Sequence, residues 1–280
     1  YILENQIDKF GMHKSYNLLD HAKFINNLTE IKNIFLYFDY EVPKSLNSSV
    51  LLMSSILNQY FHLNGSLPLF NGTNNNYTDK IYNSINKDEY LKLRSFLDNY
   101  NGIAFYIDTK KRIFFDVVQP NKDEVSSSLS SGTLSFELSS NSEKIITNCG
   151  ASESMGENPE FLRYSAAHST LILQNTNVSE IKENNPHIKF PQKVSFNKEE
   201  SENFTILQGS HNGYVKKFSK IIKRKLKINK NDFILEGEDS IISLKTLSNK
   251  IIYHIRFHLM PGITYNLTNN KKNIILKTPL

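Results

Sequence analysis

The chain has 280 residues, of which 39% are hydrophobic and 22% are charged, and its net charge is only +5. This composition supplies a buried core for one large or two ordinary domains, and it excludes a disordered chain. No apolar run approaches the ~20 residues of a membrane-spanning helix. The single cysteine excludes an internal disulfide and a zinc site built from several cysteines. Since the chain lacks an initiating Met and ends within a strand-like pattern, we expect a piece of a longer protein.

The first hundred residues have the apolar spacing of helices. Residues 17–35 follow a 3.6-residue period, and Asn17 is positioned to cap that helix. Pro43 fits the first turn of a second helix that we expect to end at Gly65. Two shorter helices are expected at 79–85 and 87–97. The polar residues 71–76 predict a surface loop or the rim of an active site.

The apolar period changes from 3.6 to two near Tyr100. Residues 103–107 and 113–118 predict a hairpin, and short strands separated by Asn, Gly, Ser or Lys turns follow it. Numerous strands without intervening helices indicate packed antiparallel sheets. We therefore place a domain boundary at about residue 99 and expect no helix longer than about three turns after residue 105.

Two features of the strand region have competing explanations. The basic stretch 216–230 contains alternating lysines that suit a polyanionic glycan or a nucleic acid, or simply form a solvated outer face. Nucleic acid is disfavoured because no aromatic side chains are interleaved with these charges. Residues 251–259 predict one strand whose His254, Arg256 and His258 share a face, which we expect to be a buried polar cluster.

Two histidines lie at strand ends, where side chains from different strands can converge. His168 precedes a strand, and His211 lies between two glycines. Such a pair could bind one metal ion or one anionic sugar, or it could be structural. Cys149 could act as a nucleophile with His168, but a small buried residue at a strand end is the favoured interpretation.

Six short segments together carry a family resemblance. They are residues 133–139, 148–151, 167–171, 210–214, 237–239 and 255–259. In order and spacing they resemble the C-terminal β-domain of the heparinase II/III-like family. The resemblance covers about residue 102 to the end, and more weakly the helices before it. It implies a two-domain α+β fold, in which the last helices of an (α/α) toroid occupy residues 1–99 and an antiparallel β-sandwich occupies residues 100–280.

The resemblance also implies an activity and a set of candidate residues. Members of this family cleave uronic-acid polysaccharides by β-elimination, and the substrate carboxylate must be neutralised before its neighbouring proton can be removed. The candidates are Asn17 and Arg163 as neutralising donors, His13 as a neighbour of Asn17, Tyr60 or alternatively Tyr16 as the toroid tyrosine, and His168 as acid or base. Asn17 could instead serve only as a helix cap.

A zinc ion is implied by the same resemblance. His168 and His211 match the two histidine ligands of some family members, but the expected Asp is missing and only glutamates such as Glu180 and Glu183 stand nearby in sequence. The family often has a further histidine two residues before His168, where this chain has Ala166. We therefore expect a structural zinc site whose third ligand is unidentified.

The resulting expectation is a bacterial polysaccharide lyase of the periplasm or cell envelope that acts on an acidic polysaccharide. The alternative is a non-catalytic carbohydrate-binding or cell-envelope protein that retains the lyase fold.

Overall fold

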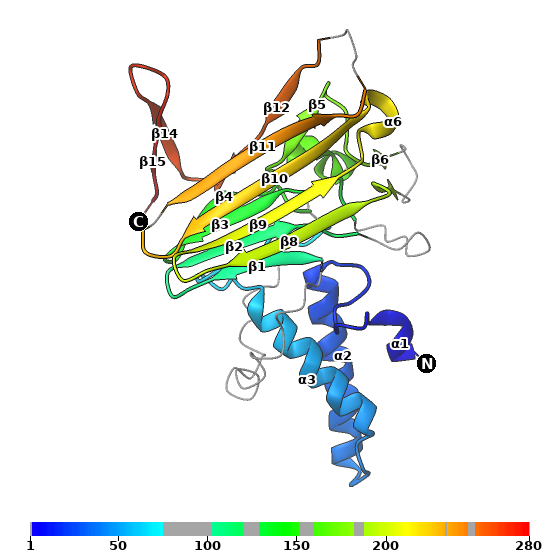
Figure 1. Ribbon diagram of the computed structural model, residues 1–280. Helices are drawn as coiled ribbons and strands as arrows, with labels where there is room; N and C mark the ends of the chain where they lie inside the picture. Colours follow the sequence, from blue (N-terminus) through cyan, green and yellow to red (C-terminus); the bar gives the residue numbers. More distant parts are fainter. Residues whose placement is uncertain are drawn as a thin grey trace.

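The computed structural model describes seven stretches of the chain. They are residues 2–74, 102–119, 129–151, 159–181, 188–232, 234–245 and 250–279. Within them the fold combines a few helices with antiparallel sheets (Figure 1). The predicted helices at 79–85 and 87–97 and the predicted boundary at residue 99 lie outside the described residues.

Within the described residues, three helices precede the strands. They are α1 (Ile2–Gln6), α2 (Leu18–Tyr37) and α3 (Lys44–Gln59). Asn17 caps α2 as predicted, because its Oδ1 accepts hydrogen bonds from the backbone N–H groups of Leu19 and Asp20 at 2.8 and 3.3 Å. The helix α3 begins after Pro43, also as predicted, but it ends before Gly65.

Two larger sheets make up most of the strand region. The first contains β1 (Ile103–Ile107), β2 (Lys111–Asp116), β3 (Phe136–Ser140), β4 (Glu143–Thr147) and β13 (His258–Leu259), in the order β1-β2-β3-β4-β13. The second contains β8 (Val194–Glu200), β9 (Phe204–His211), β10 (Lys220–Asn229) and β11 (Leu235–Ser243), in the order β11-β10-β9-β8.

Smaller elements lie outside these two sheets. Three two-stranded pairs join β5 (Leu171–Leu173) to β12 (Tyr253–Ile255), β6 (Glu180–Ile181) to β7 (Ile188–Lys189), and β14 (Thr264–Leu267) to β15 (Ile274–Lys277). Short helical segments are η2 (Pro159–Arg163), η3 (Ser165–Ala167) and α6 (Val215–Phe218). Since none of these exceeds five residues, the predicted absence of a long helix after residue 105 is confirmed for the described part of the chain.

The fold has three layers, with the β1 to β4 sheet between the helices and the second sheet (Figure 1). Alternation along β2 explains this arrangement, since Phe114 packs into the helical core while Ile113 and Phe115 pack into the core shared with β9 and β10. At Gly209 on β9, an added Cβ would lie 2.4 Å from Leu134 Cδ2, so the close approach of the two sheets requires glycine there.

The basic strand β10 has alternating faces, as predicted. Arg224 points into the core at 2% exposure, while the neighbouring lysines face outward. On that outer face Lys225 pairs in register with Glu238, and Lys227 Nζ lies 3.0 Å from a carboxylate oxygen of Glu236. These acidic neighbours offset the charge of two of the lysines, as is typical of a solvated outer face.

Three local predictions were wrong. Residues 71–74 form a buried turn and not a surface loop, and Cys149 is exposed and not buried. The expected strand 251–259 is broken into β12 and β13, which pair with β5 and β4 respectively. His254 and Arg256 are therefore exposed and do not form a buried cluster with His258.

Candidate functional site

The buried turn at residues 71–74 joins the helices to the strand region. The Thr73 hydroxyl accepts a hydrogen bond from Leu18 N at the start of α2, at 3.1 Å, and the Thr73 carbonyl accepts one from Ala151 N at 3.2 Å. Asn71 Oδ1 accepts a hydrogen bond from Ser130 N at 3.3 Å. The turn thereby brings the N-terminus of α2 next to the loops that follow β4 and precede β3.

Asn17 and His13 lie on the helical side of this junction. Asn17 is 5% exposed, and its Oδ1 also accepts a hydrogen bond from the Thr73 hydroxyl at 3.3 Å. His13 is only half-buried, its Nδ1 lies 2.8 Å from the hydroxyl of Ser15, and burial is the main cause that lowers its pKa. Of these two candidates His13 is the more accessible, and Asn17 is held by its role as helix cap.

Tyr60 does not lie with the other candidates. It is 1% exposed in the core between α3 and β1, and its hydroxyl donates to the carbonyl of Ile103 at 2.9 Å. Burial raises the pKa of this phenol far above its ordinary value. This position does not favour proton transfer with a substrate.

Arg163 and His168 lie in and directly after the short helical segments η2 and η3. The Arg163 side chain donates from Nε to the carbonyl of Leu129 at 3.1 Å, and it remains partly exposed. His168 is 1% exposed, its Nδ1 lies 2.9 Å from the carbonyl of Tyr164, and burial lowers its pKa to about 4. An added Cβ at Gly132 would lie 2.5 Å from His168 Cδ2, so the imidazole fills the space beside that glycine. A pKa of about 4 does not suit an acid or base that works near neutral pH.

His211 belongs to the core between the sheets. It is 1% exposed, and its Nδ1 accepts a hydrogen bond from Gly213 N at 3.2 Å. In a neutral imidazole the proton is then on Nε2, which is buried without a hydrogen-bond partner. Burial, reinforced by the charge of Arg224, lowers the pKa of His211 to about 3.

These environments test whether the described residues fit a zinc ion. His168 donates from Nδ1 to a carbonyl and leaves Nε2 as a possible ligand, as metal-binding histidines do. His211 has the opposite tautomer, with its proton on Nε2, and the positive charge of Arg224 lies nearby. Glu180 is partly exposed, and its carboxylate faces Lys189 and Lys216. Within the described ranges no three His, Cys, Asp or Glu side chains gather so that they could hold a metal. The described residues do not fit a zinc site, and Glu183 lies outside them.

His258 is a candidate that the sequence interpretation missed, because it was assigned to a buried cluster. It is half-buried, its Nε2 lies 2.9 Å from the carbonyl of Ala166, and its Nδ1 lies 3.8 Å from Cys149 Sγ. If Nε2 donates to that carbonyl, the lone pair of Nδ1 faces the exposed thiol. Partial desolvation lowers the pKa of His258. It also raises the pKa of the Cys149 thiol, whose sulfur faces the imidazole although the residue as a whole is exposed.

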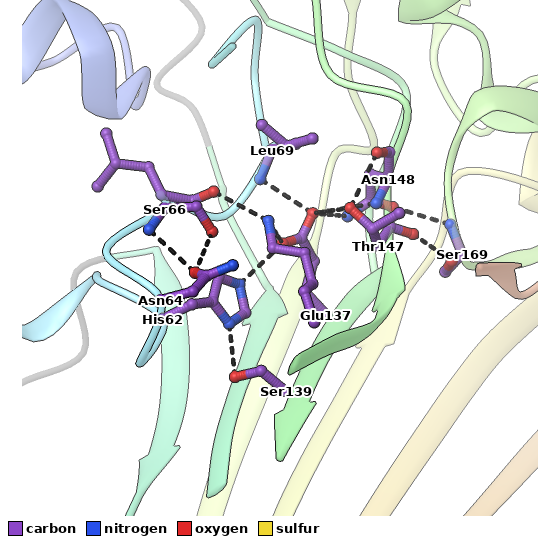
Figure 2. A network of polar contacts seen from close by, with 11 residues as sticks. His62, Asn64, Ser66, Leu69, Glu137, Ser139, Thr147, Asn148 and Ser169 are labelled. Atoms are coloured by element: carbon purple, nitrogen blue, oxygen red, sulfur yellow. Dashed lines mark hydrogen bonds and ion pairs between the residues drawn. The ribbon is translucent and has the colours of Figure 1, made fainter. Parts of the chain in front are cut away.

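A buried carboxylate, Glu137, organises the strand side of the junction (Figure 2). It is 0% exposed, and its Oε2 lies 3.0 Å from His62 Nε2 and 2.9 Å from Lys144 Nζ. Its Oε1 accepts hydrogen bonds from Leu69 N and Asn148 N, both at 3.0 Å. The ion pair with Lys144 and the hydrogen bond from His62 hold the pKa of Glu137 at about 2 in spite of burial.

Comparison with known families identifies the chain. Residues 93–279, two thirds of the sequence, match the family described as Heparinase II/III-like, C-terminal. The chain belongs to this family. No curated protein matches it.

Solved structures of heparinases share the fold. The heparan sulfate lyase HepC from Pedobacter heparinus has a TM-score of 0.70 and 14% identity over 98% of this chain. A structure of heparinase III gives the same TM-score, identity and coverage, and the BT4657 gene product, also a heparinase III, has a TM-score of 0.70 at 12% identity over 96% of this chain. At such identities the similarity establishes the fold alone. This heparinase II/III-like chain spans 44, 48 and 43% of those three chains, respectively.

The family motifs of this heparinase II/III-like chain meet in space. Glu137 from the first motif bonds Asn148 from the second, Asn148 Oδ1 accepts from Ser169 N of the third at 2.8 Å, and Ser169 Oγ accepts from His258 N of the last at 2.9 Å. Arg224 bonds both Asp239 and the carbonyl of Ser169. Motif membership was the signal in the sequence that could have identified Glu137 and His258.

Proposed function

We propose that the protein is a polysaccharide lyase that cleaves an acidic, uronic-acid-containing polysaccharide by β-elimination. Family membership over residues 93–279 is the observation that carries this proposal, and the shared fold with three heparinases supports it. The described chain corresponds to less than half of those proteins, so the proposal concerns the whole polypeptide to which it belongs. The end of an (α/α) toroid is the corresponding proposal for the helical residues 1–99.

The proposed reaction needs a neutralising donor, a base and an acid, and no water. A donor to the uronate carboxylate acidifies the C5 proton, a base removes that proton, and the C4–O bond breaks as the C4=C5 double bond forms. An acid protonates the departing oxygen. Arg163, partly exposed and permanently charged, is the best-supported donor among the candidates, with Asn17 as the second.

Accessibility decides which imidazoles could transfer the proton. His21, His62, His168 and His211 are all buried. His254 is exposed on β12 and makes no hydrogen bond to the junction among the described residues. His13 and His258 are half-buried, one on each side of the junction, and so remain within reach of solvent. We assign proton transfer to these two, while the buried His168, bonded to the carbonyl of Tyr164, supports the loop.

The test uses the full-length protein with alginate, heparan sulfate, chondroitin and hyaluronan. At least one of them should generate the ultraviolet absorbance of an unsaturated uronide. Arg163→Ala and His258→Ala should each lower the rate by ~10²-fold or more, whereas His254→Ala, on the exposed strand β12, should retain it. Reducing ends formed without that absorbance would indicate hydrolysis and contradict the proposal.

The second candidate function is a carbohydrate-binding or cell-envelope protein that keeps the fold without catalysis. The burial of Tyr60, with its hydroxyl bonded to Ile103, is the observation that favours it, since no catalytic tyrosine is then identified in the described helices. Binding of an acidic oligosaccharide by calorimetry, without any elimination product, would support this function.

Localisation in the bacterial periplasm or cell envelope is a further part of the proposal, and it rests on the family resemblance alone. Among the described residues, no helix is both long enough and apolar enough to cross a membrane. Detection of the native protein in a periplasmic or envelope fraction would test this part.

A further inference from the structure

Glu137 is held by partners from both the helical and the strand parts of the chain (Figure 2). His62 and Leu69 come from the segment that follows α3, whereas Lys144, Thr147 and Asn148 come from β4 and its end. Lys144 Nζ also donates to the carbonyl of Leu67 at 3.1 Å. A fully buried carboxylate with this many donors has one well-defined position, because the loss of any partner would leave a buried polar group unpaired.

This fixed position extends to His258 through two further residues. Asn148 donates from both its backbone N and its Nδ2 to Glu137 Oε1, at 3.0 and 3.3 Å. Its Oδ1 accepts from Ser169 N at 2.8 Å. The hydroxyl of Ser169 donates to the carbonyl of Thr147 at 2.6 Å and accepts from His258 N at 2.9 Å.

The same residues fix the surroundings of the His258 imidazole. Cys149 follows Asn148 directly, and its backbone N donates to the carbonyl of Ala167 at 3.0 Å. Its thiol faces His258 Nδ1, while the carbonyl of Ala166 faces Nε2. The group beside Nδ1, the Cys149 thiol, belongs to the residue that follows Asn148. The group beside Nε2, the Ala166 carbonyl, belongs to the segment that ends at Ser169.

We propose that Glu137, acting through Asn148 and Ser169, is a positioning residue that fixes the His258 imidazole and the Cys149 loop at the junction of the helical and strand parts. The catalytic consequence rests on the proposed lyase function, whereas the positioning itself does not. A chain of hydrogen bonds from a buried carboxylate to an accessible imidazole would preset that imidazole for proton transfer.

The test compares two variants of the full-length protein. Asn148→Ala removes the side chain that links Glu137 to Ser169. Ser139→Ala is the matched control, because the Ser139 hydroxyl bonds His62 Nδ1 at 2.8 Å on the opposite side of the same cluster. Three readouts are the reaction rate of Cys149 with dithiodipyridine, the NMR titration of His258, and kcat and KM for elimination. Cys149→Ser and His258→Asn identify the two signals.

Positioning predicts a distinct response of each variant. In Asn148→Ala the thiol should react several-fold faster and the pKa of His258 should rise towards its ordinary value, since burial raises the pKa of the thiol and lowers that of the imidazole. The value of kcat should fall about tenfold or more with KM little changed. Ser139→Ala should lower the melting temperature and leave all three readouts unchanged.

Several outcomes would overturn the proposal. Wild-type thiol reactivity and His258 titration in Asn148→Ala would refute the positioning, as would equal changes in Ser139→Ala. If Asn148→Ala does not fold, Ser169→Ala replaces it, because this variant removes the Ser169 Oγ contacts with His258 N and the Thr147 carbonyl and leaves Asn148 and Glu137 in place. Unchanged kcat beside altered thiol and imidazole signals would refute the catalytic role. If no elimination occurs at all, the proposed function fails, but the thiol and imidazole readouts still decide the positioning.

Discussion

Asn17 uses its side-chain carbonyl oxygen as the cap of α2, while neutralisation of a carboxylate would use its side-chain N–H group. Oδ1 accepts from Leu19 N, Asp20 N and the Thr73 hydroxyl. The two roles therefore require different atoms of one amide and are chemically compatible. The hydrogen bonds from Leu19 N and Asp20 N show that the cap is made.

Replacing Asn17 by Asp and by Ala separates the two roles. Asp retains the capping oxygen and suits the positive end of the helix dipole, so we expect near wild-type stability. Ala should lose about 1 kcal/mol in urea unfolding because the cap is missing. If the amide neutralises the substrate, both variants should lose ~10²-fold in elimination rate. An Asn17→Asp enzyme with wild-type activity would reduce Asn17 to a cap.

The histidines His168 and His211 lead to a prediction about metal content. The resemblance implies zinc, whereas the tautomer of His211 and the charge of Arg224 disfavour a cation beside it. We expect elemental analysis of the purified protein to give well under one zinc per chain, and a chelator to leave the melting temperature unchanged. One zinc per chain that is lost in His211→Ala would contradict this, and it would mean that a ligand outside the described residues completes the site.

Elements were predictable from the sequence wherever their determinants are local. The 3.6-residue period and Asn17 were enough to locate α2, and alternation in β10 correctly separated Arg224 from its neighbouring lysines. The break between β12 and β13 was not predictable, because it depends on pairing with β5 and β4, more than eighty residues earlier in the chain. The Glu137 cluster escaped prediction for the same reason, since His62 lies 75 residues before it.

Removal of one partner of the salt bridge between β10 and β11 should destabilise the fold strongly. Arg224 donates from Nε and from one terminal nitrogen to the two carboxylate oxygens of Asp239, at 2.7 and 2.8 Å, and also to the carbonyls of Leu134 and Ser169. Asp239→Ala leaves a buried guanidinium without its counter-charge, which should cost about 3–5 kcal/mol in urea unfolding. Glu238→Ala, one residue away on the exposed face, should change stability by less than about 0.5 kcal/mol. Equal effects of the two substitutions would contradict this account.

Burial of ionisable groups throughout the described molecule couples its stability to pH. Burial lowers the pKa of His21, His62 and His168 to about 4 and that of His211 to about 3. Their unfolded-state pKa is about 6.5, so the unfolded chain binds more protons between these values. The free energy of unfolding is therefore not reduced by these histidines above pH 6.5. It decreases as the pH falls from 6.5 towards 4, because the unfolded chain takes up protons that the folded protein does not. Glu137 adds a loss of the same sign at lower pH, since its pKa is about 2 when folded.

One buried acid opposes this trend. Burial raises the pKa of Asp116 to about 7, far above its unfolded value, so the folded protein binds a proton there that the unfolded chain does not bind until below pH 4. Its contribution is present at low pH and is lost as the pH rises through 7, which has the opposite sign to the histidines. With four histidines against one aspartate, the net effect should still be destabilisation by mild acid.

The melting temperature should therefore fall steeply between pH 6.5 and 4.5, measured by circular dichroism in buffers of equal ionic strength. Each net proton taken up on unfolding changes the free energy of unfolding by about 1.4 kcal/mol per pH unit, so a net uptake of two or three protons removes much of a typical stability of about 5–15 kcal/mol. His211→Gln removes one titrating group and should make the slope shallower by about one proton. His254→Gln, at an exposed position, should leave the slope unchanged. A melting temperature that stays constant down to pH 4.5 would mean that these histidines are not buried in solution as they are here.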